Sequence, residues 1–538
     1  MSSPEIPPTT SASPFRAALA RLGRPWPFRI TLMTLTVLVY AVYAISRYET
    51  YLVAGYDLGI FDQVVRSYAH FEAPIVTLKG DGYNIWGDHF HPIIALWAPL
   101  YWLWDDPRML LVGQVLVVAV AVIPVHRFLL RHMRARWANL MAAAIILGWP
   151  IEDLIDFDVH EIAFAVPLLA WAIDALDTRR YRQLIAACGL LLLVREDMGA
   201  VVAMAGLVCA GSAWWRARAR RRAGEEPVVD RGVLVGLGLV VAGAAVFVLV
   251  TMVVIPHFST GGFDYWDYSQ LGDGVSGAIV GALTQPWKVV ALLFWPGMKT
   301  LTWLLLLVPL LFLPLRSPLA LLALPIMAER MLADRENLWT FHFHYNAPVW
   351  IILALAAVDG AALLARSERL HARFERMKTL ELQRLLALWA AFTVLIGWVL
   401  GIGGYLISGS RTITDIYPLP RLITGEAFRM TSEQHDRAAI VAYLPADTCV
   451  VADDRIAGQL TRSNRVTVPG VSQHRQDFYV LDFSEPYPAT TPADWTTEEA
   501  SAHATDAGFH EVFRSGDIVV YQSPDYAGPS PQCSPVES

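Results

Sequence analysis

The stretch VLVGLGLVVAGAAVFVLVTMVVI, residues 233–255, decides the fold class, because its 23 consecutive residues carry no charged side chain. A helix needs about 20 apolar residues to cross the hydrocarbon core of a bilayer. Four further stretches of 16 to 23 residues are nearly free of charge, namely residues 30–45, 110–125, 347–365 and 385–407. So many long apolar stretches are typical of a polytopic, all-α membrane domain and exclude a chain made only of soluble domains.

Basic residues between the apolar stretches indicate which loops face the cytoplasm, because Lys and Arg collect in short cytoplasmic loops. Arginine clusters lie before residue 30 and at residues 127–136, 179–180, 216–222, 316 and 366–378. Threading the chain through these clusters predicts about eleven transmembrane helices with the N-terminus inside. The weakest expected spans are residues 184–194 and the helix that follows them. Residues 93–104 are apolar but too short to span, and are expected to be re-entrant or interfacial.

The threading divides the chain into four parts. They are a cytoplasmic disordered N-terminus at 1–29, a transmembrane domain at 30–407, an extracytoplasmic α/β domain at 408–525 and a disordered tail at 526–538. The transmembrane domain is expected to expose its loops on the extracytoplasmic face, at residues 48–106, 149–161, 256–285 and 332–346. No cleavage pattern follows the first apolar stretch, so it is expected to remain as an anchor. The predicted location is a bacterial plasma membrane.

The composition becomes mixed and polar after the last apolar stretch. Short strand-like runs lie at residues 449–452, 478–481 and 518–521, and amphipathic stretches typical of helices lie near 432–443 and 496–507. This alternation predicts a small α/β domain at the C-terminus.

Four cysteines in 538 residues are too few for a disulfide scaffold. Cys188 and Cys209 fall in apolar stretches, where small thiols pack. Cys449 and Cys533 can pair in an oxidising compartment, but Cys533 lies in the Pro/Ser-rich tail that is expected to be disordered, which leaves the pairing open. The formal net charge of −7 is a poor guide to binding partners, because acidic and basic clusters lie in different loops.

Two carboxylates in the first expected outside loop are candidates for catalysis. Asp57 and Asp62 lie among apolar neighbours in the box Tyr-Asp-Leu-Gly-Ile-Phe-Asp-Gln at residues 56–63. Partial desolvation raises the pKa of a carboxyl group and can make it a competent base. The alternative is that Asp57 caps a helix that begins near Leu58, since Asp satisfies free backbone donors at that position.

Further ionisable clusters map to the same expected face. The candidate substrate-binding residues are Asp88, His89, His91, Asp158, His160, Glu161, Arg195, Glu196, Asp197, Arg335, His342 and His344. Ionisable residues at the edge of membrane segments are costly unless they are paired or functional. A guanidinium binds two phosphate oxygens in parallel, so Arg195 and Arg335 suit a phosphate or pyrophosphate, unless they pair with nearby carboxylates.

Two His-Phe-His patterns are candidates for a metal site. His89 with His91, and His342 with His344, could supply imidazoles to a divalent metal such as Zn, Mn or Mg. The alternative is that these histidines are hydrogen-bond partners of sugar hydroxyls and phosphates. The basic loop 216–222 follows an apolar stretch, so it is interpreted as an orientation signal and not as a nucleic-acid patch.

Three boxes carry a resemblance to a known family: Tyr-Asp-Leu-Gly-Ile-Phe-Asp-Gln at 56–63, His-Phe-His-Pro at 89–92 and Asp-Val-His-Glu at 158–161. With these boxes the chain resembles a large bacterial family of predicted multi-pass membrane proteins, of the DUF2079 type. That family looks like the GT-C class of membrane glycosyltransferases, which place an acidic residue in the first extracytoplasmic loop and use polyprenyl-phosphate-linked sugars as donors. The resemblance matches Asp57 to that acidic residue, and the nearby Asp62 leaves the choice between the two open.

The function expected from these features is transfer of a sugar from a polyprenyl-phosphate donor to an acceptor of the cell envelope, at the extracytoplasmic face. The expected partners are membrane lipids, the lipid-linked donor and that acceptor, with no nucleic acid. No Gly-rich phosphate loop or Walker motif is found, which fits a donor that is not a nucleotide. Two alternatives remain: a transporter or flippase, in which the same charges would line a pathway, and a non-catalytic scaffold or sensor.

Overall fold

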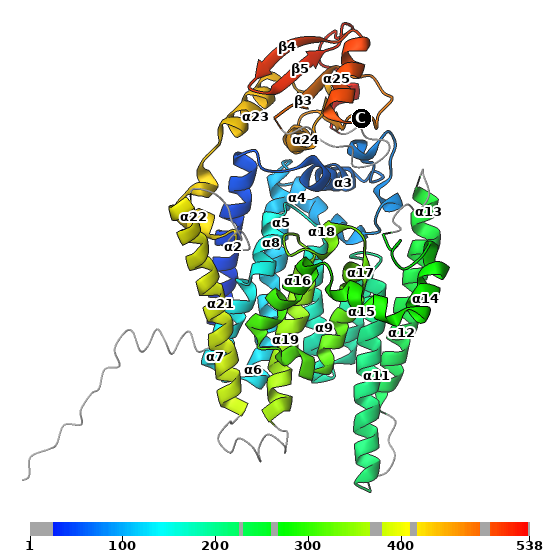
Figure 1. The fold of residues 1–538 in the computed structure, drawn as a ribbon, viewed down its shortest axis with the longest axis vertical. Helices are drawn as coiled ribbons and strands as arrows, with labels where there is room; N and C mark the ends of the chain where they lie inside the picture. The colour runs from blue at the N-terminus through cyan, green and yellow to red at the C-terminus, as the bar shows by residue number, and fades with distance from the viewer. Residues whose placement is uncertain are drawn as a thin grey trace, which may run out of the picture.

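The computed structural model describes residues 25–224, 230–259, 267–365, 379–408, 417–484 and 495–535. Long helices run side by side through most of the molecule, and a smaller sheet domain lies across one end of the bundle (Figure 1). The expected disorder of residues 1–24 lies outside the described part of the chain, whereas residues 25–29 already belong to the first helix.

Within the described residues, seven helices are long and apolar enough to span a membrane. They are α2 (Pro25–Glu49), α5 with α6 (Arg108–His132), α7 with α8 (Ala135–Asp156), α11 (Met198–Arg222), α12 to α13 (Arg231–Phe258), α19 (Asn346–Ala365) and Glu381–Gly403 of α21 (Thr379–Ser408). An eighth is added if α14 (Gly274–Thr284) and α15 (Pro286–Phe294), which are bent by 100°, count as one span. The multi-pass architecture is confirmed, but the expected count of about eleven is not reached.

Short helices account for the difference. The weakest expected span forms α10 (Tyr181–Leu191), which has only 11 residues. After α16 (Gly297–Leu307) the chain continues as 3-10 turns, because three prolines each remove a backbone donor there (Pro309, Pro314, Pro318). Other short elements include η4 (Pro92–Trp97), α4 (Ala98–Tyr101), α9 (Ala165–Thr178), η7 (Val308–Leu310), η8 (Leu313–Arg316), η9 (Pro318–Ala323), α17 (Leu324–Leu332) and α18 (Glu336–Trp339). Thus residues 93–104 form no span, as expected.

The centre of the bundle is α19, whose side chains are almost all apolar. In its most apolar window 83% of the residues are buried, against 22% for the window of Arg231–Phe258. A helix without a polar face lies in the middle of a bundle or faces lipid on one side. The burial therefore places α19 in the core and α12 at the periphery.

Glycines allow α11 and α12 to pack closely. A Cβ atom on Gly236 would lie 2.5 Å from the carbonyl oxygen of Gly206, and one on Gly243 would lie 2.4 Å from that of Gly199. Small residues let helix backbones approach in lipid, where no hydrophobic force drives association. This contact gives the peripheral α12 its partner in the bundle.

The C-terminal domain is a five-stranded mixed sheet with the order β2-β1-β3-β5-β4. β1 pairs in parallel with β2 and β3, whereas β5 pairs antiparallel with β3 and β4. The strands are β1 (Cys449–Ala452), β2 (Arg465–Thr467), β3 (Phe478–Asp482), β4 (His510–Ser515) and β5 (Ile518–Gln522). Three of these strands were expected from the sequence, and β2 and β4 were not.

Among the described residues, three α-helices pack with the sheet: α23 (Ser432–Tyr443), α24 (Asp454–Leu460) and α25 (Thr497–Asp506). Capping boxes begin two of them, with Thr431 and Gln434 before α23 and with Thr496 and Glu499 before α25. In such a box two backbone donors are satisfied reciprocally, which defines the start of the helix. The small α/β domain expected after the last apolar stretch is therefore present, and α24 is an addition to it.

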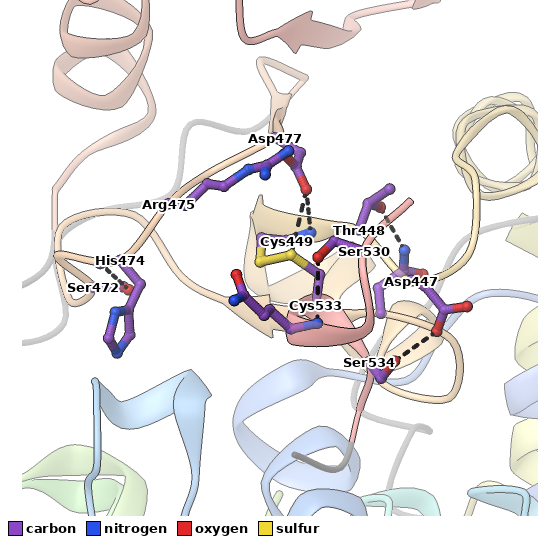
Figure 2. Close-up of a disulfide and its surroundings, with 12 residues drawn as sticks. Asp447, Thr448, Cys449, Ser472, His474, Arg475, Asp477, Ser530, Cys533 and Ser534 are labelled. Atoms are coloured by element: carbon purple, nitrogen blue, oxygen red, sulfur yellow. Dashed lines mark hydrogen bonds and ion pairs between the residues drawn. A yellow bond between two sulfur atoms is a disulfide. The ribbon is translucent and has the colours of Figure 1, made fainter. Parts of the chain in front are cut away.

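The end of the chain is held to the sheet by a disulfide between Cys449 on β1 and Cys533 (Figure 2). Cys533 is buried, and nearby Ser530 N donates to the carbonyl oxygen of Asp447 at 2.8 Å. The expectation of a disordered tail is therefore wrong for residues 526–535. The Pro/Ser-rich composition suggested disorder. Composition does not reveal a covalent link to a strand far away in sequence, and here that link orders the tail.

Replacing both Cys449 and Cys533 by Ser should lower the local unfolding free energy of the C-terminal domain by about 2–4 kcal/mol, since the bridge closes a long loop. Denaturant-dependent proteolysis of the intact protein measures this change. Cys188 and Cys209 are free and buried in the bundle, so replacing both by Ala is the control and should leave proteolysis of the domain unchanged. Equal protection in the Cys449/Cys533 variant would contradict the prediction.

Candidate active site

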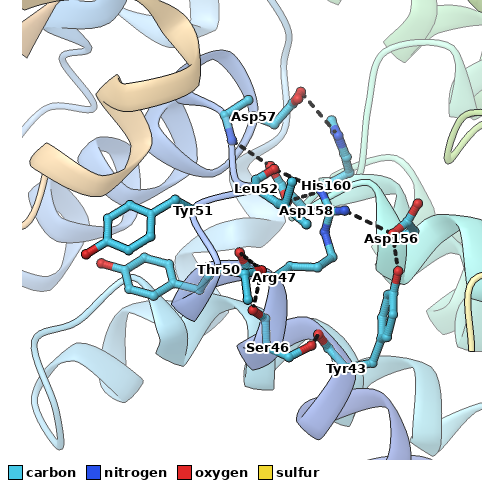
Figure 3. Close-up of polar contacts among 12 residues, drawn as sticks. Tyr43, Ser46, Arg47, Thr50, Tyr51, Leu52, Asp57, Asp156, Asp158 and His160 are labelled. Atoms are coloured by element: carbon cyan, nitrogen blue, oxygen red, sulfur yellow. Dashed lines mark hydrogen bonds and ion pairs between the residues drawn. The ribbon is translucent and has the colours of Figure 1, made fainter. Parts of the chain in front are cut away.

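Asp57 lies on η1 (Gly55–Gly59), a π turn that joins the end of α2 to α3 (Ile60–Ala69). Its side chain is 23% exposed, and Oδ1 lies 3.5 Å from Nε2 of His160 (Figure 3). The N-cap residues of η1 and α3 are Ala54 and Gly59, and Asp57 is at neither position. The capping alternative for Asp57 is therefore contradicted, and its carboxylate faces another part of the chain.

Ion pairs and hydrogen bonds fix the segment that leads into η1. Arg47 on α2 pairs with Asp156 at 3.0 Å and with Asp158 at 3.1 Å. The second carboxylate oxygen of Asp158 accepts a hydrogen bond from Ala54 N at 2.8 Å, and Tyr43 donates its hydroxyl to Asp156 at 2.5 Å. Asp158 has a φ of +49°, which is unusual for a residue with a side chain and is held here by these contacts. The loop before Asp57 is thus fixed to the loop before His160 (Figure 3).

His160 is held in position but keeps one ring nitrogen available. Its backbone N–H donates to Gln114 at 2.8 Å, and its ring stacks on that of His344 with centroids 3.6 Å apart. Phe157 stacks nearby at 5.4 Å. Within the described residues Nε2 makes no hydrogen bond. Burial, with the positive charge of Arg195, lowers the pKa of His160 to about 3, so the imidazole is neutral at physiological pH.

The environment of Asp57 favours its protonated form. Burial raises the pKa of Asp57 well above its ordinary value, and the carboxylates of Asp158 and Asp454 raise it further, whereas Arg47 lowers it. A carboxylate with a raised pKa is a stronger base when it ionises. The site therefore combines a basic carboxylate with the neutral imidazole of His160.

Arg195 lies on the turn between α10 and α11 with three acidic neighbours. It binds both oxygens of Asp197, at 2.9 and 2.7 Å, and lies 3.5 Å from Glu161. Burial raises the pKa of Glu161, and Arg195 opposes this shift. Glu329 on α17 is a further negative charge that acts on Arg195. The guanidinium is thus partly neutralised and oriented by carboxylates.

His89 and Glu196 form the next pair along this surface. Nδ1 of His89 lies 2.7 Å from Glu196, whose other oxygen accepts a hydrogen bond from Phe90 N at 3.1 Å. Burial opposes the charged forms, but the pairing outweighs it and raises the pKa of His89 to about 9 and lowers that of Glu196 to about 2. His91 is buried, which lowers its pKa to about 4. His89 is therefore charged at neutral pH, and His91 is neutral.

Asp62 lies apart from this group, in a buried ion pair. Both its oxygens accept from Arg66, at 3.1 and 3.2 Å, and Tyr101 donates its hydroxyl at 2.5 Å. Its carboxylate is fully buried on α3. Of the two candidate bases, Asp57 alone faces His160, and Asp62 has the surroundings of a structural ion pair.

Three of the expected binding residues also face other partners. Asp88 pairs with Lys79 at 2.7 Å, and Arg335 pairs with Asp267 at 2.9 Å. His342 is exposed and its ring lies against that of Phe341, while His344 points inward to His160. The second His-Phe-His pattern thus separates its two imidazoles.

The four histidines of the two His-Phe-His patterns do not gather into one group of potential metal ligands among the described residues. Across the described residues, one group of three or more potential ligands is close enough to hold an ion, and it consists of Cys449, Asp477 and Cys533. Its two cysteines are already joined to each other. One imidazole of the first pattern pairs with a carboxylate and one of the second stacks on another ring, so a metal role for these histidines stays a prediction.

The structure adds residues that the sequence did not single out. Gln114 on α5 donates to the carbonyl oxygens of Leu154 and Asp158 and accepts from His160, so it holds the loop that carries His160. Asp454 belongs to the C-terminal domain and lies beside η1. A Gln inside an otherwise apolar stretch is unusual, so the sequence offered a signal for Gln114. No sequence feature marked Asp454.

Residues 47–505 match the family model described as predicted membrane protein, DUF2079. The chain belongs to this family. The expected resemblance is therefore confirmed over most of the chain. No curated protein matches it.

Solved structures show which fold this family member adopts. ArnT from Cupriavidus metallidurans bound to undecaprenyl phosphate is 13% identical, with a TM-score of 0.50 over 93% of this chain and 99% of that chain. The apo oligosaccharyltransferase of Archaeoglobus fulgidus is 12% identical, with a TM-score of 0.37 over 84% of this chain and 69% of that chain. Both are glycosyltransferases of the GT-C class. At this identity the first likeness establishes the fold alone, and the second is too weak to carry an argument.

Proposed function

We propose that this family member is a membrane glycosyltransferase that moves a sugar from a polyprenyl-phosphate donor to a hydroxyl group of a cell-envelope acceptor. The observation that carries the proposal is the partly buried carboxylate of Asp57, which faces an imidazole nitrogen of His160 that makes no hydrogen bond among the described residues. The similar ArnT structure was bound to undecaprenyl phosphate, which supports a lipid phosphate as the leaving group.

In the proposed reaction Asp57 removes the proton from the acceptor hydroxyl. The acceptor oxygen forms a bond to the anomeric carbon of the sugar while the bond from that carbon to the phosphate oxygen breaks, with inversion. The polyprenyl phosphate leaves with the electron pair, and the proton stays on Asp57. The raised pKa of Asp57 makes it a better proton acceptor than an exposed carboxylate.

Two further roles follow from the geometry around Asp57. Arg195 is proposed to bind the donor phosphate, because its positive charge acts on His160, which faces Asp57. Arg47, whose charge acts on Asp57 itself, is already paired with Asp156 and Asp158. Arg335 is less suited, because it pairs with Asp267 at the surface. The neutral His160 is proposed to orient a sugar or acceptor hydroxyl through Nε2.

The membrane orientation is part of the proposal. The sheet domain and α3, which follows the turn of Asp57, lie at the same end of the bundle, and the basic C-terminal end of α11 lies toward the other end (Figure 1). Disulfides persist in oxidising compartments, so the Cys449–Cys533 bridge supports an extracytoplasmic C-terminal domain. About eleven crossings, as the basic loops indicate, would need the shorter helices to complete the spans.

The test is a transfer assay with the full-length chain in proteoliposomes made from bacterial lipids. Labelled sugars on polyprenyl phosphate are offered with an envelope fraction as acceptor. We expect label to move from the lipid phase into the acceptor fraction in a protein-dependent way. Movement of intact labelled lipid between leaflets without transfer would instead favour the flippase alternative and overturn the proposal.

A further inference from the structure

The C-terminal domain is in close contact with the membrane domain at the turn that carries Asp57. Helix α24 packs against η1 with glycines on both sides. A Cβ atom on Gly55 would lie 2.7 Å from Cβ of Ala457, and one on Gly458 would lie 2.7 Å from the carbonyl oxygen of Ala54. Neither position has room for a side chain, so the two turns are in backbone contact.

A carboxylate from the C-terminal domain satisfies the start of this turn. Oδ1 of Asp454 accepts a hydrogen bond from Tyr56 N at 2.6 Å. The first backbone donors of a helical turn lack partners within the turn, and Ala54, at the N-cap of η1, offers no side chain for them. Asp454 therefore performs the capping role that a residue within the loop would ordinarily perform.

More hydrogen bonds join the same two segments. Gln459 donates to the carbonyl oxygen of Tyr48 at 2.7 Å, and Arg437 donates to that of Tyr51 at 3.2 Å. From the other side, Asp158 accepts from Ala54 N. The loop between α2 and η1 is thus held between the sheet domain and the loop that carries His160.

We propose that Asp454 is a positioning residue for Asp57, so that the C-terminal domain completes the active site and is not an independent appendage. This inference rests on the proposed function for the meaning of activity, but the contact itself does not depend on it. Asp454 acts through the backbone of η1: it orients the turn so that the Asp57 carboxylate faces His160. It is also a negative charge beside that carboxylate.

The charged and titratable groups that face Asp57 come from four parts of the chain. The loop after α8 contributes His160 and Asp158. Arg47 comes from α2, Asp454 from α24 and Tyr345 from the turn before α19. Among these, the carboxylates of Asp158 and Asp454 raise the pKa of Asp57. Removing the charge of Asp454 should therefore lower that pKa, since one repulsion is lost.

The experiment compares Asp454→Ala with Asp454→Asn in the full-length protein. Asn can still accept the hydrogen bond from Tyr56 N, whereas Ala cannot. We expect Asp454→Ala to lose about 10- to 100-fold in kcat, with little change in KM, because a small displacement of a reacting group has that effect. Asp454→Asn should restore most of kcat, while the acid limb of its pH profile moves to lower pH. Glu498→Gln, an exposed carboxylate on α25, is the control and should change neither.

A second measurement does not need activity. The rate of carbodiimide modification of Asp57, followed by mass spectrometry against pH, reports its protonation directly. Its midpoint should move to lower pH in Asp454→Asn and stay unchanged in Glu498→Gln. If the wild-type protein transfers no sugar but this midpoint moves, the proposed function fails and the positioning inference stands. A wild-type kcat in Asp454→Ala, or an unmoved midpoint in Asp454→Asn, would overturn the inference.

Discussion

Asp57→Asn is expected to reach wild-type abundance in the membrane and to lose about 100-fold or more in turnover, the usual effect of removing a general base. Asn keeps the size of the side chain and its acceptor oxygen but cannot take a proton at neutral pH. Because Asp57 does not occupy a cap position and burial disfavours its charged form more than Arg47 favours it, the substitution should cost little stability. The loss should therefore be one of chemistry and not of folding.

The transfer assay with matched protein amounts, checked by blot, measures this effect. Asp57→Ala should lose as much turnover as Asp57→Asn. Asp62→Asn is an informative comparison, since it removes one charge of a buried ion pair, leaves Arg66 with Asp105 as its charged partner, and should reduce the amount of folded protein first. Full turnover in Asp57→Asn would remove Asp57 from the mechanism and make Asp62 the next candidate.

The pH profile of the wild-type protein adds to this test. A base works only when ionised, so activity should fall as the pH drops through the pKa of Asp57. Because burial raises that pKa, the fall should occur at higher pH than for an exposed Asp, whose ordinary value is 3.8. The acid limb of kcat/KM measures it, and a limb at the position of an exposed carboxylate would contradict the assignment.

Reporter fusions should give an all-or-none result for the orientation of the chain. A periplasmic reporter fused after Ser408, at the end of α21, should be active, and a cytoplasmic reporter at the same place should be inactive. The basic end of α11, at Arg220–Arg222, should give the opposite pattern. The physical reason is the retention of Lys- and Arg-rich segments on the cytoplasmic side.

The Cys449–Cys533 bridge provides an independent check of the same orientation. Thiol labelling of intact cells before and after reduction should show both cysteines oxidised, because reducing compartments do not keep such a bridge. A cytoplasmic C-terminus would contradict the orientation, and with it the proposed use of an extracytoplasmic lipid-linked donor.

Local patterns predicted much of this protein. The uncharged stretch 233–255 forms the span α12 to α13, and the capping residues Thr431 and Thr496 lie just before the two C-terminal helices expected from amphipathicity. The number of spans was less predictable, because proline-broken and short apolar stretches resemble spans in composition. The pairing of Cys449 with Cys533 could not be chosen from sequence, since it depends on where the chain returns.

The sequence by itself determined that this is a multi-pass membrane protein with a C-terminal α/β domain, and it singled out Asp57 and His160 as candidate site residues. These features follow from the length of the apolar stretches, the distribution of charges and short motifs, all of which can be recognised within a short segment of the sequence. Only the tertiary structure decided that Asp57 faces His160, that Asp62 is bound to Arg66, and that Asp454 reaches the turn of Asp57 from the other domain. These contacts join segments far apart in sequence, and their geometry depends on how whole helices pack, which no local pattern records.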